Sequence, residues 1–272
     1  MARRLVIASQ KGGVGKTTVA LNLAVALAER GRRTLLADLD PQGAIGLSLA
    51  KGDTELAGLA ELLLGVARPE DAVVETRLPG LRLLTRGRLD ATDVDSFEAA
   101  VARPGALDEA FGACEKGCDV MVVDTPSGLG RVTTAALSAS NFALIAFQTE
   151  SLALRSVGQA LAVVEHVQAS RNPQLRLVGI LPTLVERERG GSHAVLSEIW
   201  NGFPDALETV VPRSEAFVRA SALGIPVGFL AGDAGGPESR RFGLLADEIE
   251  ERMARLDGTE KVHEAQPARQ LL

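Results

Sequence analysis

The sequence predicts a three-layer α/β/α fold with a mostly parallel, twisted sheet between two layers of helices. An apolar strand at residues 5–8 is followed by a glycine-rich turn and by a helix over residues 19–30. Residues 120–123 and 142–147 are continuous apolar runs, typical of parallel strands covered by helices on both faces. With 272 residues, 46% of them hydrophobic, the chain can build one such domain. We expect the domain to span residues 1–256 and the polar residues 257–272 to form a disordered tail.

The glycine-rich turn has the context of a phosphate-binding loop, because it lies between a strand and a helix. Residues 9–18 read SQKGGVGKTT. Glycines let the backbone N–H groups point inward, and the start of the helix adds partial positive charge. Lys16 can reach the β- and γ-phosphates of a nucleotide, and the Thr17 hydroxyl can hold Mg²⁺. The alternative is a glycine-rich turn without a ligand.

The loop departs from the common phosphate-loop pattern in one place. The first glycine of that pattern would stand at position 10, which is Gln10 here, and Lys11 follows it. Only five of the 272 residues are lysines, and two of the five lie in this loop. General lysine usage therefore does not explain the placement of Lys11 and Lys16.

Three aspartates follow predicted strands. Asp38 and Asp40 come after the strand at residues 34–37, and Asp124 comes after residues 120–123. Ligands of open α/β sheets bind at the carboxyl ends of the strands, where carboxylates can orient water beside a metal-bound nucleotide. Two alternatives remain open on this pattern alone. The segment after Asp38 also suits a simple turn, and Asp124 also suits a helix cap.

Residues 11–18, KGGVGKTT, resemble the deviant Walker A motif of the ParA/MinD family of P-loop ATPases, closest to the ParA/Soj-type partition ATPases. Residues 38–43, DLDPQG, resemble the first switch segment of that family, and Asp124-Thr125-Pro126 resembles the second. Ala44 replaces an Asn usual in partition members, and Ser127 replaces a second proline. The resemblance implies the P-loop NTPase fold, ATP and Mg²⁺ as cofactors, and a homodimer that sandwiches ATP. It also implies ATP hydrolysis that is weak alone and stimulated by a partner.

The same resemblance implies roles for individual residues. Lys11 would reach across the dimer to the partner's nucleotide, Asp40 would position the attacking water, and Asp38 would assist near the metal. Thr17 would bind Mg²⁺ directly and Asp124 through water. Pro212, in a late motif, would lie against the adenine. The implied ATP-binding residues are Lys11, Gly12, Gly13, Val14, Gly15, Lys16, Thr17, Thr18 and Pro212.

The formal net charge is −6, so any DNA contact must come from a local basic patch. A charged loop such as residues 186–191 is usually only solvated, but the loop at this position in partition members contributes arginines to non-specific DNA binding. The candidates here are Arg187, Arg189, Arg213 and Arg219. Glu188 and Ala216 stand where those members tend to have basic residues, so the positive charge has moved by a turn or DNA binding is weaker.

The remaining chain carries no separate chemistry. We expect helices over residues 54–64, 93–113 with a break at 104–105, 192–200, 215–223 and 237–256, and a further helix that follows residues 150–154 and ends at residue 170. Strands are expected at 73–74, 81–84 and 177–183, the last including its exit. Cys114 and Cys118 lack a zinc-site pattern and are expected to be ordinary reduced residues. The sequence shows no signal peptide, no apolar run that could span a bilayer, and no basic amphipathic membrane anchor in the tail. We therefore expect a cytoplasmic, nucleoid-associated protein.

The leading functional hypothesis is a ParA-type ATPase that dimerises with ATP, binds DNA non-specifically, and drives partition or positioning of DNA or another cargo. A ParB-like or other adaptor protein would activate it. The alternative is a MinD-like spatial regulator that acts through membrane or protein partners. A third reading, a metabolic member such as an iron–sulfur reductase component, expects ligand cysteines that Cys114 and Cys118 do not provide.

Overall fold

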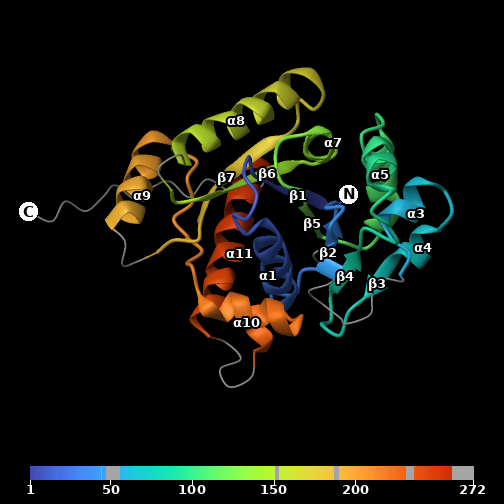
Figure 1. Ribbon diagram of the computed structural model, residues 1–272, viewed down its shortest axis with the longest axis horizontal. Coiled ribbons are helices and arrows are strands. Elements are labelled where there is room, and N and C mark those ends of the chain that lie inside the picture. Colours follow the sequence, from blue (N-terminus) through green and yellow to red (C-terminus); the bar gives the residue numbers. More distant parts are fainter. Residues whose placement is uncertain (44, 47–55, 151–152, 187–189, 231–235, 259–272) are drawn as a thin grey trace, which may run out of the picture.

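A twisted sheet runs through the centre of the computed structural model, between two layers of helices (Figure 1). The structure describes residues 1–43, 45–46, 56–150, 153–186, 190–230 and 236–258. In these residues the sheet has seven strands in the order β3-β4-β2-β5-β1-β6-β7. All neighbouring strands are parallel except β3 and β4. The strands are β1 (Arg3–Ala8), β2 (Thr34–Asp38), β3 (Val73–Glu75), β4 (Leu81–Leu84), β5 (Val120–Asp124), β6 (Phe142–Gln148) and β7 (Arg176–Thr183).

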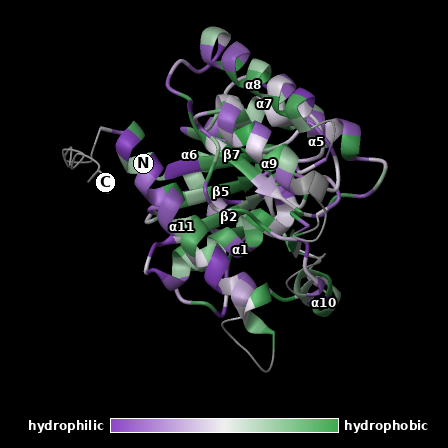
Figure 2. Ribbon diagram, turned by 90° about the vertical axis from the view of Figure 1, so that its left-hand side faces the viewer, coloured by the Kyte–Doolittle hydropathy of each residue, from purple (hydrophilic) through white to green (hydrophobic). Residues whose placement is uncertain are grey.

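Alternate residues of the central strands enter two separate cores. In β1, Leu5 and Ile7 pack on the face covered by α1 (Lys16–Glu29), α10 (Glu215–Leu223) and α11 (Pro237–Leu256). Val6 and Ala8 pack on the opposite face. Because both faces are buried, the strand sequences are continuously apolar instead of alternating. Figure 2 shows these apolar strands inside the molecule, with hydrophilic residues on the outer sides of the helices. The predicted three-layer fold is confirmed.

The opposite face is covered by helices from the middle of the chain. These are α3 (Leu59–Leu63), α4 (Pro69–Ala72), α5 (Val94–Val101), α6 (Ala106–Cys114), α7 (Arg131–Ser138) and α8 (Ala153–Ser170). Helix α9 (Gly190–Gly202) packs with α8 beside β7 in a smaller apolar cluster, and the 3-10 turn η2 (Val227–Phe229) precedes α11. Among the described residues, no helix combines the length and the apolar character that crossing a lipid bilayer requires.

Most predicted element bounds agree with the structure, and α10 and α11 match exactly. The prediction of a helix from residue 54 is wrong for residues 56–58, because α3 begins only at Leu59. Gly58 lies against the backbone of residues 85 and 87, and a Cβ there would lie 2.5 Å from the Gly87 nitrogen. This close approach fixes an extended backbone at Gly58 (φ −157°) and delays the helix. Residues 54–55 and residues 259–272 of the predicted tail at 257–272 lie outside the described residues.

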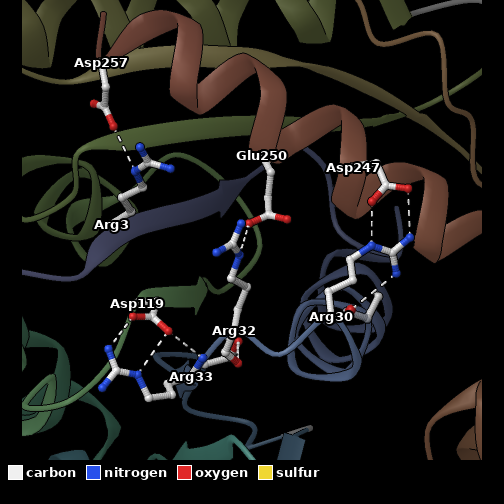
Figure 3. Close-up of polar contacts among 10 residues, drawn as sticks. Arg3, Arg30, Arg32, Arg33, Asp119, Asp247, Glu250 and Asp257 are labelled. Atoms are coloured by element: carbon white, nitrogen blue, oxygen red, sulfur yellow. Dashed lines mark hydrogen bonds and ion pairs between the residues drawn. The ribbon is translucent and has the colours of Figure 1, made fainter. Parts of the chain in front are cut away.

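Ion pairs fasten α11 to the C-terminal end of α1 and to the end of the sheet at which β1 and β2 begin, opposite the strand ends that carry the predicted site (Figure 3). Arg30 binds Asp247 at 2.6 Å, and Arg32 binds Glu250 at 2.5 Å.

Nearby, the guanidinium and the backbone N–H of Arg33 both donate hydrogen bonds to the Asp119 carboxylate, and they lower the pKa of that carboxyl to about 2. The stabilisation from this pair is therefore complete above the ordinary pKa of an aspartate and is lost as the pH falls through about 2. Because the pair is exposed, its contribution is small.

We expect Phe111→Ala to lower the free energy of unfolding by about 3–5 kcal/mol. Phe111 on α6 is fully buried in the core of the opposite face, and the Arg4 guanidinium lies 5.6 Å from the centre of its ring. Urea unfolding measures the loss. Phe229→Ala is the matched control, because Phe229 is 48% exposed and its truncation leaves no buried cavity. Equal losses in the two variants would contradict this description of the core.

Candidate functional site

The loop between β1 and α1 leads directly into the start of a helix, whose first backbone N–H groups have no partner within the helix. Gly13 and Gly15 have φ angles of +73° and +88°, which residues with a Cβ rarely adopt. Gly15 is the N-cap of α1, no side chain caps the helix, and its first turn has no acidic residue. Helix α1 begins at Lys16, three residues earlier than the sequence predicted. An anion bound here would accept hydrogen bonds from the first backbone N–H groups of the helix.

Lys16 is buried, with 6% of its surface exposed, and its Nζ donates a hydrogen bond to the Ser9 Oγ at 3.0 Å. The Ser9 hydroxyl in turn donates to the Lys11 carbonyl at 2.7 Å. Burial lowers the pKa of the Lys16 ammonium, and the charges of Asp124 and Asp40 oppose this shift. The ammonium group is thus held near two carboxylates and has little contact with water.

Lys11 has different surroundings from Lys16. Its side chain is 37% exposed, and its Nζ lies 3.4 Å from the Glu150 carboxylate, just after β6. Lys16, in contrast, is buried near the Asp124 and Asp40 carboxylates. The two lysines of this loop therefore lie in different places: Lys16 is inside the site, and Lys11 is at its rim.

The strand register brings Asp38 and Asp124 together, because they are direct partners at the ends of β2 and β5. Asp124 is completely buried, and among the described residues neither of its carboxylate oxygens accepts a hydrogen bond of normal geometry. Burial raises the pKa of Asp124 to about 7, against the opposing effects of the nearby Thr17 hydroxyl and the Lys16 charge. A buried carboxyl with so little hydrogen bonding is costly, and a bound cation would offset this cost.

Asp38 is also buried, but its carboxylate accepts two backbone hydrogen bonds. The donors are the N–H of Asp40 at 2.9 Å and the N–H of Ile45 at 3.2 Å. Burial and the charge of Asp124 raise the pKa of Asp38 well above its ordinary value. The Asp38 carboxylate thus fixes the backbone of the predicted first switch segment while it faces Asp124.

These groups fit a magnesium ion, because oxygen ligands of the hard kind that it prefers lie around two buried carboxylates. A divalent cation would offset the desolvation that raises the pKa of Asp38 and Asp124. Thr17 could bind it through its hydroxyl, and the two carboxylates could hold its water molecules. Within the described part of the chain, no three His, Cys, Asp or Glu side chains form a cluster that could hold a metal. Phosphate oxygens and water would therefore have to complete such a site.

Asp40 lies in a tight turn at the edge of this cluster. Its carboxylate accepts the N–H of Gln42 at 2.9 Å, and its carbonyl accepts the N–H of Gly43 at 2.8 Å. Asp40 is partly exposed, yet its charge reaches Lys16, Asp38 and Asp124 strongly enough to affect the pKa of each. A carboxylate in this position can accept a hydrogen bond from a water molecule beside a bound phosphate.

The structure does not test the predicted adenine contact. Pro212 is half-buried and pairs with Val185 through an isolated β-bridge. A cavity of about 140 Å³ separates α1 from α10 beside Thr17 and Thr18, but Pro212 is not part of its lining. The lining residues are Thr17, Thr18, Leu21, Asn22, Phe217, Ala220, Ser221 and Ile225.

Of the predicted DNA-binding arginines, Arg213 and Arg219 are exposed. Arg213 forms an ion pair with Glu186 at 2.8 Å, and Arg219 lies on α10. Arg187, Arg189 and Glu188 lie outside the described residues, as does Ala44. Arg213 and Arg219 therefore define the described part of the candidate surface.

Sequence reasoning missed four contributors. Ser9 bonds Lys16, Glu150 pairs with Lys11, and the Arg86 guanidinium donates to the Pro41 carbonyl. In the sequence, Ser127 is notable only as a residue that replaces a proline. It packs against the loop, since a Cβ added to Gly12 would lie 3.1 Å from the Ser127 Oγ. The contact of Lys11 with Glu150 and that of Arg86 with Pro41 join segments that are far apart in the sequence, so no local pattern predicts them. Both cysteines are free thiols, and burial raises the pKa of Cys114 to about 11.

Comparison with known proteins agrees with this geometry. A family model described as an AAA domain (AAA_31) matches residues 2–177. The chromosome partitioning protein ParA of Caulobacter vibrioides is 35% identical over 230 residues, which cover 83% of this chain and 86% of that protein. The chromosome-partitioning ATPase Soj of Thermus thermophilus is 36% identical over 258 residues, covering 92% and 96% of the two chains.

Solved structures of known proteins also resemble this chain. The crystal structure of cobyrinic acid a,c-diamide synthase from Mycobacterium smegmatis, with bound ATP analog and magnesium, has a TM-score of 0.76 to this chain. The two are 32% identical, and the match covers 96% of this chain and 98% of that one. ATP and Mg²⁺ are the cofactors of P-loop ATPases of this kind. The prediction of these two cofactors is therefore confirmed. On its sequence and its fold, the chain belongs to the ParA/MinD family of P-loop ATPases.

Proposed function

We propose that this chain is a ParA-type ATPase that dimerises with ATP, binds duplex DNA without sequence preference, and drives partition or positioning of DNA or another cargo. The observation that carries the proposal is the different placement of the two loop lysines. Lys16 is buried beside carboxylates that fit a metal-bound nucleotide, and Lys11 lies at the rim, where a second subunit could be reached. The relatives named as partition proteins support the proposed cargo class.

Nucleotide binding would use the groups at the start of α1. The N–H groups of the loop and the Lys16 ammonium would hold the phosphates, and the Thr17 hydroxyl would bind the metal. Asp124 would hold the metal through a water molecule, and Asp38, on the neighbouring strand β2, would assist near the metal. Mg²⁺, when bound, neutralises charge that develops on the transferred phosphoryl group. On phosphate binding, Lys16 exchanges the Ser9 hydroxyl for a phosphate oxygen.

Hydrolysis would use Asp40 to orient the attacking water. Its carboxylate accepts a hydrogen bond from the water and aims the lone pair of the water at the γ-phosphorus, and the products are ADP and phosphate. The turn at residues 40–43 fixes where this carboxylate lies. Placing the attacking water molecule correctly is the main contribution that a protein makes to this reaction.

Dimer formation would bring Lys11 to the partner's phosphates. The contact of Lys11 with Glu150 does not oppose this, because an exposed ion pair contributes only about 0–1 kcal/mol. A phosphate with several negative charges in a closed interface attracts the ammonium far more strongly. Because the site is complete only in the dimer, a single chain should hydrolyse ATP slowly, and an adaptor that favours the complete site should stimulate it.

DNA binding would use the arginines near the start of α10. A net charge of −6 provides no general attraction to DNA, so the contact must be local. Arg219 is exposed, and Arg213 is held by Glu186, which reduces its availability to a phosphate. Dimerisation doubles the number of such contacts, and this makes binding depend on ATP. The proposal places the protein in the cytoplasm, on the nucleoid when ATP is bound.

The experiment is binding to random-sequence duplex DNA with ATP·Mg²⁺, with ADP or without nucleotide, across a salt series. We expect binding only with ATP, falling steeply as salt increases, because counterion release dominates non-specific binding. If ATP produces a dimer that does not bind DNA, the nucleoid proposal fails. A surface that acts through membranes or proteins, as in a MinD-like regulator, is then favoured.

Arg219→Ala is expected to weaken ATP-dependent DNA binding and to flatten its salt dependence. Each lost phosphate contact lowers the slope of log K against log salt by about 0.9. Arg213→Ala should have the smaller effect, because Arg213 must share its guanidinium between Glu186, at 2.8 Å, and a DNA phosphate. Arg171→Ala is the matched control, because Arg171 is exposed after α8, on the other side of the sheet from α10. Equal slopes for all three variants would exclude α10 from the DNA surface.

A further inference from the structure

Arg86 lies over the turn that carries Asp40. It follows β4, and its Nη1 donates a hydrogen bond to the Pro41 carbonyl. The same side chain covers Gly43, where an added Cβ would lie 2.7 Å from the Arg86 Cδ and 3.1 Å from its Cζ. Gly43 has a φ of +62°, so the turn is both left-handed and closely covered at this residue. An arginine side chain thus holds the outer side of residues 40–43.

The backbone of Arg86 is itself fixed by α3. The N–H of Ala60 donates to the Arg86 carbonyl at 2.9 Å, and the N–H of Leu59 donates to the Thr85 carbonyl at 2.8 Å. The Glu61 carboxylate accepts the N–H groups of Gly58 and Arg88 at 2.9 and 3.0 Å. These bonds hold residues 85–88 in place, so the guanidinium extends from a rigid base.

Two groups therefore hold the Asp40 turn from different sides. The buried Asp38 carboxylate accepts the N–H groups of Asp40 and Ile45, which fixes the inner side. Arg86 holds the Pro41 carbonyl, which is the next acceptor along the chain. The bonds of Asp40 to Gln42 and Gly43 are internal to the turn and do not fix its position relative to the sheet.

We propose that Arg86 is a positioning residue that holds the turn at residues 40–43, and with it the Asp40 carboxylate, in the place required for ATP hydrolysis. This inference rests on the proposed function, in which Asp40 orients the attacking water. Arg86 contacts neither the phosphate loop nor the buried carboxylates in any described interaction, so its effect belongs to turnover and not to nucleotide binding. Small displacements of a positioned group cost large factors in rate.

The test compares turnover with nucleotide binding in Arg86→Ala. We expect kcat to fall about 10-fold to 100-fold, while KM for ATP and the Kd of a non-hydrolysable analogue stay within about twofold. Arg77→Ala is the matched control, because Arg77 is exposed in the turn at the other end of β4. Unchanged kcat in folded Arg86→Ala would overturn the inference, and so would an equal fall in Arg77→Ala.

A conservative variant and chemical rescue separate positioning from stability. Arg86→Lys keeps the charge and one donor, so its kcat should lie between those of the wild type and Arg86→Ala. Millimolar guanidinium ion should restore part of the turnover of Arg86→Ala without changing its melting temperature. If Arg86→Ala does not fold, Arg86→Lys alone carries the test. Wild-type kcat in that variant would then overturn the inference.

Asp40→Ala, measured in parallel, distinguishes failure of this inference from failure of the proposed function. The double variant Asp40→Ala, Arg86→Ala should be no slower than Asp40→Ala, because Arg86 acts through Asp40. Multiplied losses would overturn the inference. If Asp40→Ala lowers kcat and Arg86→Ala does not, the proposed function stands and the role of Arg86 is wrong. If Asp40→Ala keeps wild-type kcat, the proposed role of Asp40 fails, and the inference fails with it.

Discussion

Lys16→Ala is expected to weaken ATP binding about 30-fold to 5,000-fold, because removing one partner of a buried charged contact costs about 2–5 kcal/mol. The Lys16 ammonium is buried at the start of α1 and lies near Asp124 and Asp40, where the phosphates and the metal would bind. Titration of the protein with a fluorescent ATP analogue in the presence of Mg²⁺ measures the change.

Lys116→Ala is the control for this variant, because it makes the same substitution at an exposed turn after α6. It should bind ATP like the wild type. Circular dichroism and thermal unfolding check that Lys16→Ala is folded, which matters because it leaves Asp124 with less compensation. ATP affinity equal to that of the wild type in folded Lys16→Ala would refute the assignment of the phosphate loop.

Asp40→Ala is expected to keep ATP binding and the dimer while kcat falls about 100-fold to 10,000-fold, the usual contribution of a positioned acid–base group. Asp40 lies at the edge of the carboxylate cluster in a turn that is bonded to itself, so its removal leaves the phosphate loop intact. Phosphate release under saturating ATP, measured beside equilibrium binding of the nucleotide, separates the two effects.

Asp95→Ala on α5 serves as the control for Asp40→Ala, since Asp95 is exposed and lies on a helix outside the site. Loss of ATP binding in Asp40→Ala would show that Asp40 supports the nucleotide and not the water. Unchanged turnover would remove Asp40 from the hydrolysis step altogether.

The sequence predicts those parts of the site whose residues are neighbours along the chain. The loop from Ser9 to Thr18 is continuous, and the strand before it and the helix after it have clear apolar patterns. The sheet could be predicted for the same reason, because buried parallel strands are continuous apolar runs. The bounds of α10 and α11 follow from local signals, Ser214 as an N-cap and proline at the start of α11.

Contacts between distant segments could not be predicted in this way. Asp38 and Asp124 meet because β2 lies beside β5, an order that no local pattern specifies. Arg86 reaches Pro41 because β4 lies on the other side of β2. The late start of α3 at Leu59 depends on the close approach of Gly58 to residues 85–87, which overrides local helix propensity.

The molar mass of the protein with ATP·Mg²⁺ or ADP·Mg²⁺, measured by light scattering after size exclusion, tests the central claim most directly. Asp40→Ala is used beside the wild type, so that ATP persists during the measurement. The account predicts twice the monomer mass with ATP, the monomer with ADP, and the monomer for Lys11→Ala in both. A monomer that binds ATP but shows the same mass with either nucleotide would contradict the account.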